Sequence, residues 1–159
     1  MGRPVKRKGF SWFLENVLPL LDDDYLFLMI GPRSKKITKP LWKRILPEKW
    51  IFEINLFLGL ISDEEKILAL VQQPAIQHKV IQTGAIPFQE VMGLLGIADL
   101  FVMPNIKVEG DAEGFGLVAL EAMAAHTPVV VSDTGGLSAI VEHGVTGMKA
   151  YKGSAESIA

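Results

Sequence analysis

Short apolar runs alternate with helix-like stretches along most of this chain of 159 residues. Strands are expected at residues 25–30, 80–82, 100–103 and 129–132. Helices are expected at residues 63–73, 87–95, 116–125 and 137–143. Strands and helices that alternate at this spacing favour right-handed β-α-β crossovers. The sequence therefore predicts an α/β fold with a Rossmann-like, doubly wound parallel sheet.

Several element ends are expected from single residues. Residues 1–5 resemble the tail of a further strand, and Ser11 is the expected N-cap of a helix up to residue 21. Asp63 is expected to cap the helix over residues 63–73. The last residues, 154–159, are expected to be helical.

The composition suits a single cytoplasmic domain. Nearly half of the residues are apolar, and the length allows one hydrophobic core rather than two. The absence of cysteine excludes disulfides and thiolate metal sites and favours a reducing compartment. No N-terminal apolar run resembles a signal peptide, and the apolar patch at residues 50–61 is too short to cross a bilayer.

Charge is distributed unevenly along the chain. Residues 1–49 hold eleven Lys and Arg against five Asp and Glu, and the remainder holds five against thirteen. A basic N-terminal third suits phosphates or an anionic membrane face, so peripheral membrane association of a parent enzyme is compatible with it. The cluster Lys35, Lys36, Lys39, Lys43 and Arg44 is equally explained as a solvated surface. No basic-aromatic platform or groove-binding motif suggests nucleic-acid recognition.

Potential ligand-binding residues follow the predicted strands. In open parallel sheets, ligands bind beyond the carboxyl ends of the strands. The residues expected at this edge are Arg3, Gly31, Gly84, Pro104, 109–113 and 133–136. We therefore expect these segments to share one rim.

The segment from Glu113 to Glu121 indicates which ligand such a rim suits. An acidic residue precedes a Gly-Phe-Gly turn, and the helix that follows carries a second glutamate. Carboxylates accept hydrogen bonds from hydroxyls, and the N–H groups at a helix N-terminus favour phosphate. A nucleotide-sugar combines both features. The alternative is an ordinary turn into a helix with Glu121 in solvent.

The same segment resembles a family signature. Glu113 and Glu121 bracket seven residues, with Gly-Phe-Gly-Leu after the first and Glu-Ala-Met-Ala-Ala beginning at the second. This pattern resembles that of the retaining group 1 glycosyltransferases, where it lies in the donor-binding half of a GT-B fold. Further similar segments are Gly2-Arg3 with Lys8-Gly9, Gly84 with 98–104, and Gly135-Gly136 with Gly144 and Gly147.

The resemblance assigns the catalytic roles to three residues. Arg3 and Lys8 would hold the donor diphosphate and neutralise the charge that develops as the nucleotide leaves. Glu113 would accept hydrogen bonds from hydroxyls of the transferred sugar. Lys6 and Arg7 lie next to this pair in the sequence, and we expect both to face solvent.

The resemblance also indicates which residues bind the rest of the donor. Glu121 would bind the ribose hydroxyls, and the base would meet backbone groups after Gly84, with Ala85 and Ile86 as candidates. The expected backbone contacts to sugar and phosphate come from Gly114, Phe115, Gly116, Leu117, Gly135 and Gly136. Phe115 is expected to pack beneath its loop, and for Gly135 and Gly136 a plain turn is an equal alternative.

No metal or cofactor is expected. Glu109, Asp111 and Glu113 alternate but match no calcium-loop pattern and lack a ligating histidine. Pyridoxal phosphate, used by related phosphorylases, would need a lysine that residues 113–136 do not contain. His126 stands at a helix end where the family usually has glycine, so we expect a mildly strained cap there.

The resemblance predicts one donor-binding domain over residues 1–159, truncated at both ends and lacking the acceptor-binding domain. Its donor would be a UDP- or GDP-sugar. A parent enzyme would transfer the sugar to an acceptor hydroxyl with retention, and this piece alone would be inactive. Two alternatives are a non-catalytic nucleotide-binding module with a separate partner chain, and a scaffold that keeps only the fold.

Overall fold

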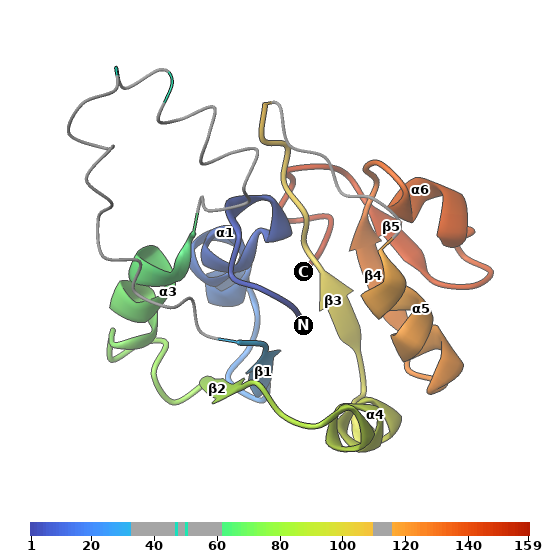
Figure 1. Cartoon of the computed structure of the whole chain (residues 1–159), viewed down its shortest axis with the longest axis horizontal. Coiled ribbons are helices and arrows are strands. Elements are labelled where there is room, and N and C mark those ends of the chain that lie inside the picture. The colour runs from blue at the N-terminus through green and yellow to red at the C-terminus, as the bar shows by residue number, and fades with distance from the viewer. Residues whose placement is uncertain (33–46, 48–49, 51–61, 110–115) are drawn as a thin grey trace.

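The structure of the chain is a computed structural model that describes residues 1–32, 47, 50, 62–109 and 116–159. Five strands alternate with helices in it (Figure 1). The strands are β1 (Phe27–Ile30), β2 (Val80–Gly84), β3 (Phe101–Met103), β4 (Val129–Ser132) and β5 (Met148–Ala150). The α-helices are α1 (Phe10–Asn16), α3 (Glu64–Val71), α4 (Phe88–Ile97), α5 (Leu117–Ala124) and α6 (Leu137–Ile140). Two 3₁₀ turns, η1 (Lys6–Lys8) and η2 (Leu18–Leu20), flank α1.

All pairings between these strands are parallel, which confirms the predicted α/β class. β1 pairs with β2, with Phe27 opposite Val80. β3 pairs with β4, and β4 pairs with β5. The strands form a two-stranded and a three-stranded sheet, in the orders β1-β2 and β3-β4-β5, where the sequence suggested one continuous sheet.

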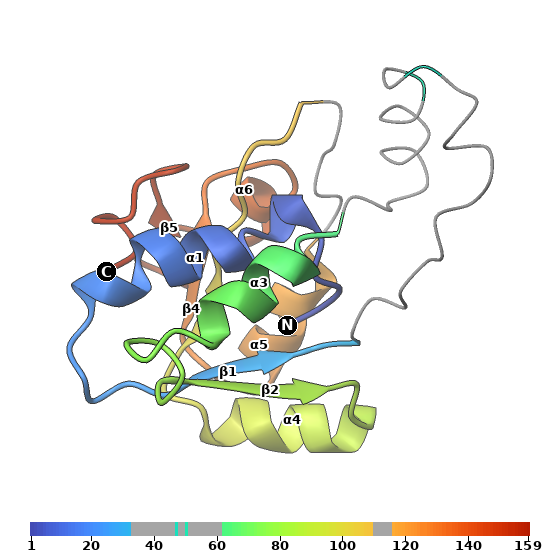
Figure 2. The same cartoon turned by 90° about the vertical axis from the view of Figure 1, so that its left-hand side faces the viewer.

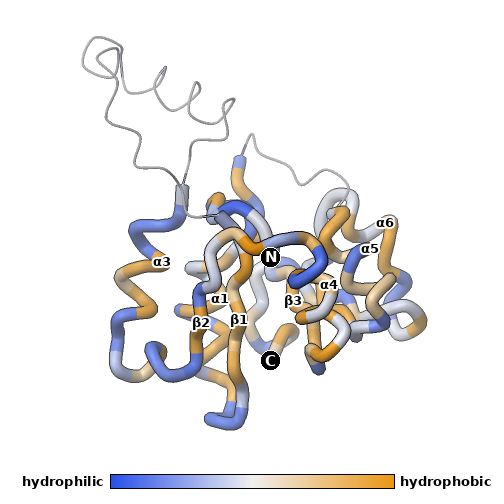
Figure 3. Tube along the Cα trace, turned by 60° about the horizontal axis from the view of Figure 1, so that its bottom comes forward, coloured by the Kyte–Doolittle hydropathy of each residue, from blue (hydrophilic) through white to orange (hydrophobic). Residues whose placement is uncertain are grey.

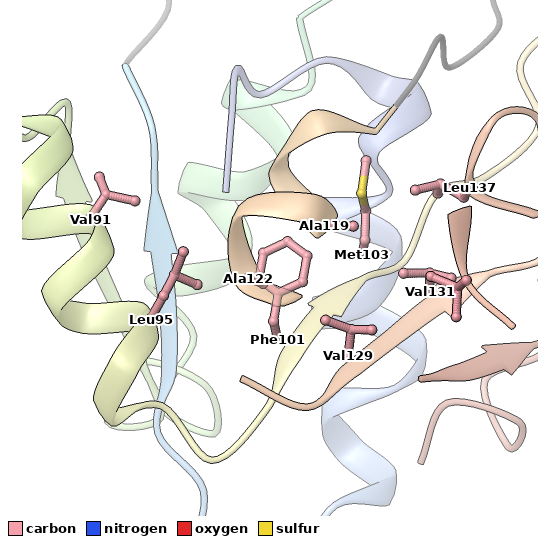
Figure 4. Packing of buried hydrophobic residues seen from close by; sticks show 10 residues of the cluster. Val91, Leu95, Phe101, Met103, Ala119, Ala122, Val129, Val131 and Leu137 are labelled. Carbon is pink, nitrogen blue, oxygen red and sulfur yellow. The ribbon is translucent and has the colours of Figure 1, made fainter. Parts of the chain in front are cut away.

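Helices cover both faces of the strands. Figure 2 shows α1 and α3 over one face of β1 and β2, and α4 beneath the other face. One buried cluster joins α1 and α3 to Met29 of β1. A second joins α4, α5 and α6 to β3 and β4, and Figure 4 shows its side chains from all five elements converging.

Strands β1 and β3 are apolar on both faces, as Figure 3 shows for β1, and therefore contact a helical layer on each side. Phe101 and Met103 point into the α4–α6 cluster, whereas Val102 packs against the α1–α3 cluster. Ile30 of β1 packs against the α4–α6 cluster, and Met29 belongs to the other. The two sheets therefore lie between the same two helical layers.

Residues 1–5 do not form a strand, contrary to the prediction. The amide of Gly2 donates to the carbonyl of Ile30 at 2.8 Å, and Val5 makes only an isolated antiparallel bridge with Ser62. Gly2 has a φ of 125°, and Pro4 has no N–H to donate to a ladder. The extended segment consequently turns away from β1 after a single hydrogen bond.

Neither predicted cap residue caps its own helix with its side chain. Ser11 lies inside the first turn of α1, where its amide donates to Oδ2 of Asp63 at 3.2 Å. Asp63 is the N-cap residue of α3 but makes no side-chain cap there. Its buried carboxylate instead satisfies an amide of α1, which every helix N-terminus leaves without an internal partner. Asp63 thereby joins the starts of two helices that pack together.

Other element ends also differ from the predictions. β5 was not expected, because Met-Lys-Ala is short and carries a charge in its centre. Residues 154–159 form turns rather than a helix, and α6 ends at Ile140. The first helix ends at Asn16 and is followed by η2, since Pro19 lacks the N–H that a continued helix needs.

His126 is strained, as predicted. Among the described non-glycine residues it alone has a positive φ, 61°. Its amide donates to Met123, and the next amide, of Thr127, donates to Ala122. This pair of bonds is a Schellman motif, which places a left-handed residue directly after α5.

Replacing His126 with glycine should therefore stabilise the protein. A left-handed backbone costs a non-glycine residue about 1 kcal/mol, so the free energy of unfolding should rise by about that amount. Urea denaturation measures the change. His126→Ala is the matched control, because alanine keeps the backbone cost and removes only the imidazole. Equal stability of the glycine and alanine variants would refute the strained cap.

Candidate functional site

The carboxyl ends of β1 and β2 meet the N-terminal segment. The amide of Gly31 donates to the carbonyl of Gly84 at 3.0 Å, just beyond both strands. A Cβ on Gly31 would lie 2.0 Å from the carbonyl oxygen of Gly2, so the two backbones touch. Arg3 directly follows Gly2 in the sequence, and it is exposed at this edge of the sheet.

The loop after Val5 connects this edge to the end of β3. The amide of Ile106 donates to the carbonyl of Arg7 at 3.0 Å. Gly9 has a φ of 68°, and a Cβ there would lie 1.9 Å from the carbonyl oxygen of Pro104. Only glycine fits this contact, which fixes Lys8 beside the end of β3.

Lys8 turns back toward the start of the chain. Its side chain is buried, with 8% of the residue exposed, and a Cβ on Gly2 would lie 3.8 Å from its Cε. The α-amino group of Met1 lies nearby. Burial, and then the charge of Lys8, lower the pKa of that amine from 8.0 to about 5. Lys8 is thus held against the N-terminal segment, which also carries exposed Arg3.

The two neighbouring basic residues behave differently from each other. Lys6 is exposed, as expected. Arg7 is not solvent-facing, and this prediction is wrong: its Nε and Nη1 atoms are buried. The backbone at Arg7 lies against the segment after β3, since its carbonyl accepts from the amide of Ile106 and Gly9 contacts Pro104.

The backbone after β2 enters the same rim. Gly84 has a φ of 74°, and a Cβ there would meet no atom within 4 Å. Glycine suits this position because of the positive φ of the turn, and not because of a close contact within the described residues. Ala85 is exposed, and Ile86 is half-buried against the α4–α6 cluster.

Helix α5 presents its first turn to solvent. Gly116 is the N-cap residue, with a φ of 60°, and a Cβ there would lie 2.4 Å from Leu137 of α6. Leu117 is 64% exposed although it is apolar. Glu121 follows one turn later and is half-buried. Glu113, Gly114 and Phe115 lie outside the described residues.

The loop after β4 is fixed by polar contacts. The hydroxyl of Ser138 donates to Oδ1 of Asp133 at 2.5 Å, and Nζ of Lys149 donates to the Ser138 carbonyl at 2.7 Å. Gly135 has a φ of 53° and is exposed, and Gly136 is the N-cap residue of α6. Sequence reasoning missed Ser138 and Lys149, because Lys149 lies in the unpredicted strand β5.

These contacts bring the segments that carry Arg3, Lys8 and Gly84 together at the carboxyl ends of β1 to β3, and Gly135 and Gly136 follow the carboxyl end of β4. Two cations, Arg3 and Lys8, lie on one side of this rim. Glycine-lined backbone follows β2 and β4, and the first turn of α5 adds amides that favour an anion. Within the described residues, no group of three His, Asp or Glu side chains has the geometry of a metal site. No helix in the described ranges has the length and apolarity of a membrane span.

Known proteins share both the sequence and the fold. A family model, glycosyl transferases group 1, matches residues 1–159. An uncharacterized glycosyltransferase of Methanocaldococcus jannaschii is 43% identical over 90 residues, which are 57% of this chain and 22% of that protein. The amylovoran biosynthesis glycosyltransferase AmsK of Erwinia amylovora is 32% identical over 103 residues, 64% of this chain and 25% of AmsK.

Among solved structures, Anabaena HepE in complex with UDP-glucose aligns with a TM-score of 0.69 at 19% identity. The alignment covers 99% of this chain and 36% of HepE. The C-terminal domain of LpcC, a group 1 family protein of Francisella tularensis, aligns with a TM-score of 0.67 at 24% identity, over 99% of this chain and 68% of that domain. At these identities the likeness shows the fold alone. The chain spans only about a quarter of the length of the two sequence relatives described above.

The predicted fold is therefore confirmed as the parallel α/β architecture of GT-B glycosyltransferases. Because the family model covers the whole chain, this chain belongs to the glycosyl transferases group 1 family.

Proposed function

We propose that this chain is the nucleotide-sugar-binding domain of a glycosyltransferase that transfers a sugar to an acceptor hydroxyl with retention. One observation carries the proposal. The chain brings Lys8 and Arg3 to the rim where β1, β2 and β3 end, in a member of the glycosyl transferases group 1 family. HepE was solved with UDP-glucose, which makes a UDP-sugar the first donor to test.

The two cations neutralise the negative charge of the leaving nucleotide. A nucleoside diphosphate gains negative charge as the glycosidic bond to the sugar breaks. A buried ammonium stabilises such charge more strongly than an exposed one, because little water screens it. Lys8 is the buried member of the pair, and exposed Arg3 offers a planar fork that suits two phosphate oxygens. The proposal assigns this role to the two side chains and to no metal.

The carboxylates and backbone groups hold the rest of the donor. Glu121 accepts hydrogen bonds from the ribose hydroxyls, and Glu113 accepts them from the transferred sugar. The amide of Leu117, at the start of α5, favours sugar or phosphate oxygens. Gly84 and Ile86 meet the base, and Gly114, Phe115, Gly116, Gly135 and Gly136 add backbone contacts.

The acceptor belongs to the other half of the proposed enzyme. The matched relatives are about four times longer than the aligned segment, so they have room for an acceptor-binding domain. Transfer takes place between the two halves, and this chain alone binds donor without transferring sugar.

Calorimetric titration tests the donor assignment. UDP, GDP, UDP-glucose and a GDP-sugar are titrated into the chain and into two variants. Glu121→Gln removes a charge-assisted hydrogen bond to the ribose, so it should weaken the binding of UDP or GDP without a sugar about tenfold. Glu113→Gln should leave that binding unchanged and reduce the preference for the sugar-bearing donor.

The control is Glu142→Gln, an exposed glutamate that precedes β5 at the opposite end of the strands. It should bind all ligands as the unmodified chain does. If both variants lost affinity equally for the nucleoside diphosphate and for the sugar-bearing donor, the division of roles between Glu113 and Glu121 would be refuted. No binding of any ligand would leave the scaffold interpretation instead.

A further inference from the structure

Helix α6 is joined to both neighbouring strands by polar contacts of one residue, Ser138. Its hydroxyl donates to Oδ1 of Asp133 at 2.5 Å, directly after β4. Its carbonyl accepts from Nζ of Lys149, the central residue of β5, at 2.7 Å. Figure 1 shows α6 beside the strands β4 and β5. Ser138 therefore connects the helix to the end of one strand and to the middle of the next.

Lys149 is well placed to hold this helix. Its amide donates to Nδ1 of His143 at 2.9 Å, and its backbone lies opposite Val131 of β4 in the parallel register. The residue is half-buried. Among the residues that the structure describes, no carboxylate pairs with its ammonium group, which donates to the Ser138 carbonyl. A lysine suits this carbonyl, because the last carbonyls of a helix have no partner within the helix.

Helix α6 in turn supports the turn that starts α5. Leu137 is fully buried, and its side chain points toward Met103 in the α4–α6 cluster (Figure 4). A Cβ on Gly116 would lie 2.4 Å from Cδ2 of Leu137 and 3.5 Å from Cδ1 of Ile140. The backbone at Gly116 thus lies directly against two side chains of α6. In a close-packed interior, a shift of α6 therefore displaces this backbone too.

Two of the segments assigned to the donor depend on this helix. Residues 135–136 lie in the loop between Asp133 and Ser138, which the hydrogen bond between those two side chains closes. The amide of Leu117 follows Gly116 at the start of α5. Both segments supply backbone N–H groups to the proposed donor site, and α6 contacts both.

We propose that Ser138 and Lys149 are positioning residues, which set the affinity for the donor without contacting it. The inference rests on the proposed function, because it takes the backbone at the start of α5 and in the loop after β4 as donor contacts. The apolar residues of α6, Leu137 and Val141, are buried and do not depend on the polar contacts. Without those contacts the helix keeps its place in the fold but loses its fixed orientation, so affinity should fall while the fold persists.

Two substitutions remove one polar contact each. Ser138→Ala loses the bond to Asp133, and Lys149→Met loses the bond to Ser138 while it keeps most of the length of the side chain. Ser138→Thr keeps a hydroxyl and should bind donor as the unmodified chain does. Lys152→Met is the matched control, because Lys152 is exposed in the turn after β5. Urea denaturation first shows that every variant is folded under the conditions of the titration.

Calorimetry is carried out with whichever of UDP-glucose and GDP-mannose binds the unmodified chain more tightly. Ser138→Ala and Lys149→Met should each weaken this binding about tenfold, the equivalent of one charge-assisted hydrogen bond. Because both act through α6, the double variant should lose little more affinity than either single variant. Additive losses in the double variant, a loss in Ser138→Thr as large as in Ser138→Ala, or unchanged binding in both single variants would overturn the proposal.

NMR spectra without donor separate this inference from the proposed function. In both single variants the amide signals of Gly116 and Leu117 should move, and in Lys152→Met they should stay in place. Unchanged signals in the two single variants would overturn the positioning role, whatever the affinities. If the unmodified chain bound neither donor, the proposed function would be refuted together with the effect on affinity, while the amide signals would still report whether α6 displaces the turn.

Discussion

Gly9→Ala should destabilise the protein by about 3 kcal/mol or more. Two costs add. The backbone at Gly9 has a φ of 68°, which costs a non-glycine about 1 kcal/mol. The added Cβ would also lie 1.9 Å from the Pro104 carbonyl oxygen, a rigid backbone atom, so the loop has to move. Thermal unfolding should begin roughly 10 °C lower.

Gly93→Ala is the matched control for this prediction. Gly93 lies within α4, and a Cβ there would meet no atom within 4 Å. Alanine is favoured over glycine in a helix by about 1 kcal/mol, so the same substitution should stabilise the protein here. If the Gly9→Ala variant unfolded no more easily than the unmodified protein, the contact between residues 7–9 and the end of β3 would be disproved.

Lowering the pH from 8 to 5 should remove about 3 kcal/mol of stability from the chain with a free amine at Met1. Burial, assisted by the charge of Lys8, lowers the pKa of this amine from 8.0 to about 5. Between these values the unfolded chain binds a proton that the folded chain does not, so the free energy of unfolding rises with pH across this window. Each pKa unit corresponds to about 1.36 kcal/mol.

Acetylation of the Met1 nitrogen provides the comparison. The acetylated chain cannot bind this proton, so its urea midpoint should vary less between pH 5 and 8. Both forms carry the same side chains, so every pH-dependent contribution other than that of the Met1 nitrogen cancels in the difference. Mass spectrometry confirms that Met1 is retained. Identical pH profiles for the two forms would contradict the burial of the amine.

The fold was largely predictable because local sequence patterns dominate it. β4 was predicted with its observed bounds, since Val-Val-Val-Ser is apolar and follows a helix end. The strain at His126 was predicted from its position after α5. β5 was missed because a three-residue strand with a central lysine depends on pairing with β4, a contact that periodicity does not encode.

The rim was predictable for a different reason. The carboxyl ends of parallel strands meet at one edge in any such sheet, so residues after strands converge regardless of detail. The partial burial of Arg7 was not predictable, because its backbone lies against residues 104–106, which are distant in the sequence. The role of Asp63 likewise depends on a hydrogen bond to Ser11, which is distant in the sequence. Long-range contacts of this kind leave no local signal.

The central claim is that one donor binds along the rim that the ends of β1 to β4 share. Its most direct measurement is a ¹H–¹⁵N NMR titration of the labelled chain with UDP-glucose and with a GDP-sugar. The account predicts saturable shifts for the amides of Lys8, Ile86, Leu117 and Gly135 with one of these donors. The amides of Gln77 and Val145 should stay unchanged. Shifts confined to residues away from the rim, or shifts at only one of its segments, would contradict the account.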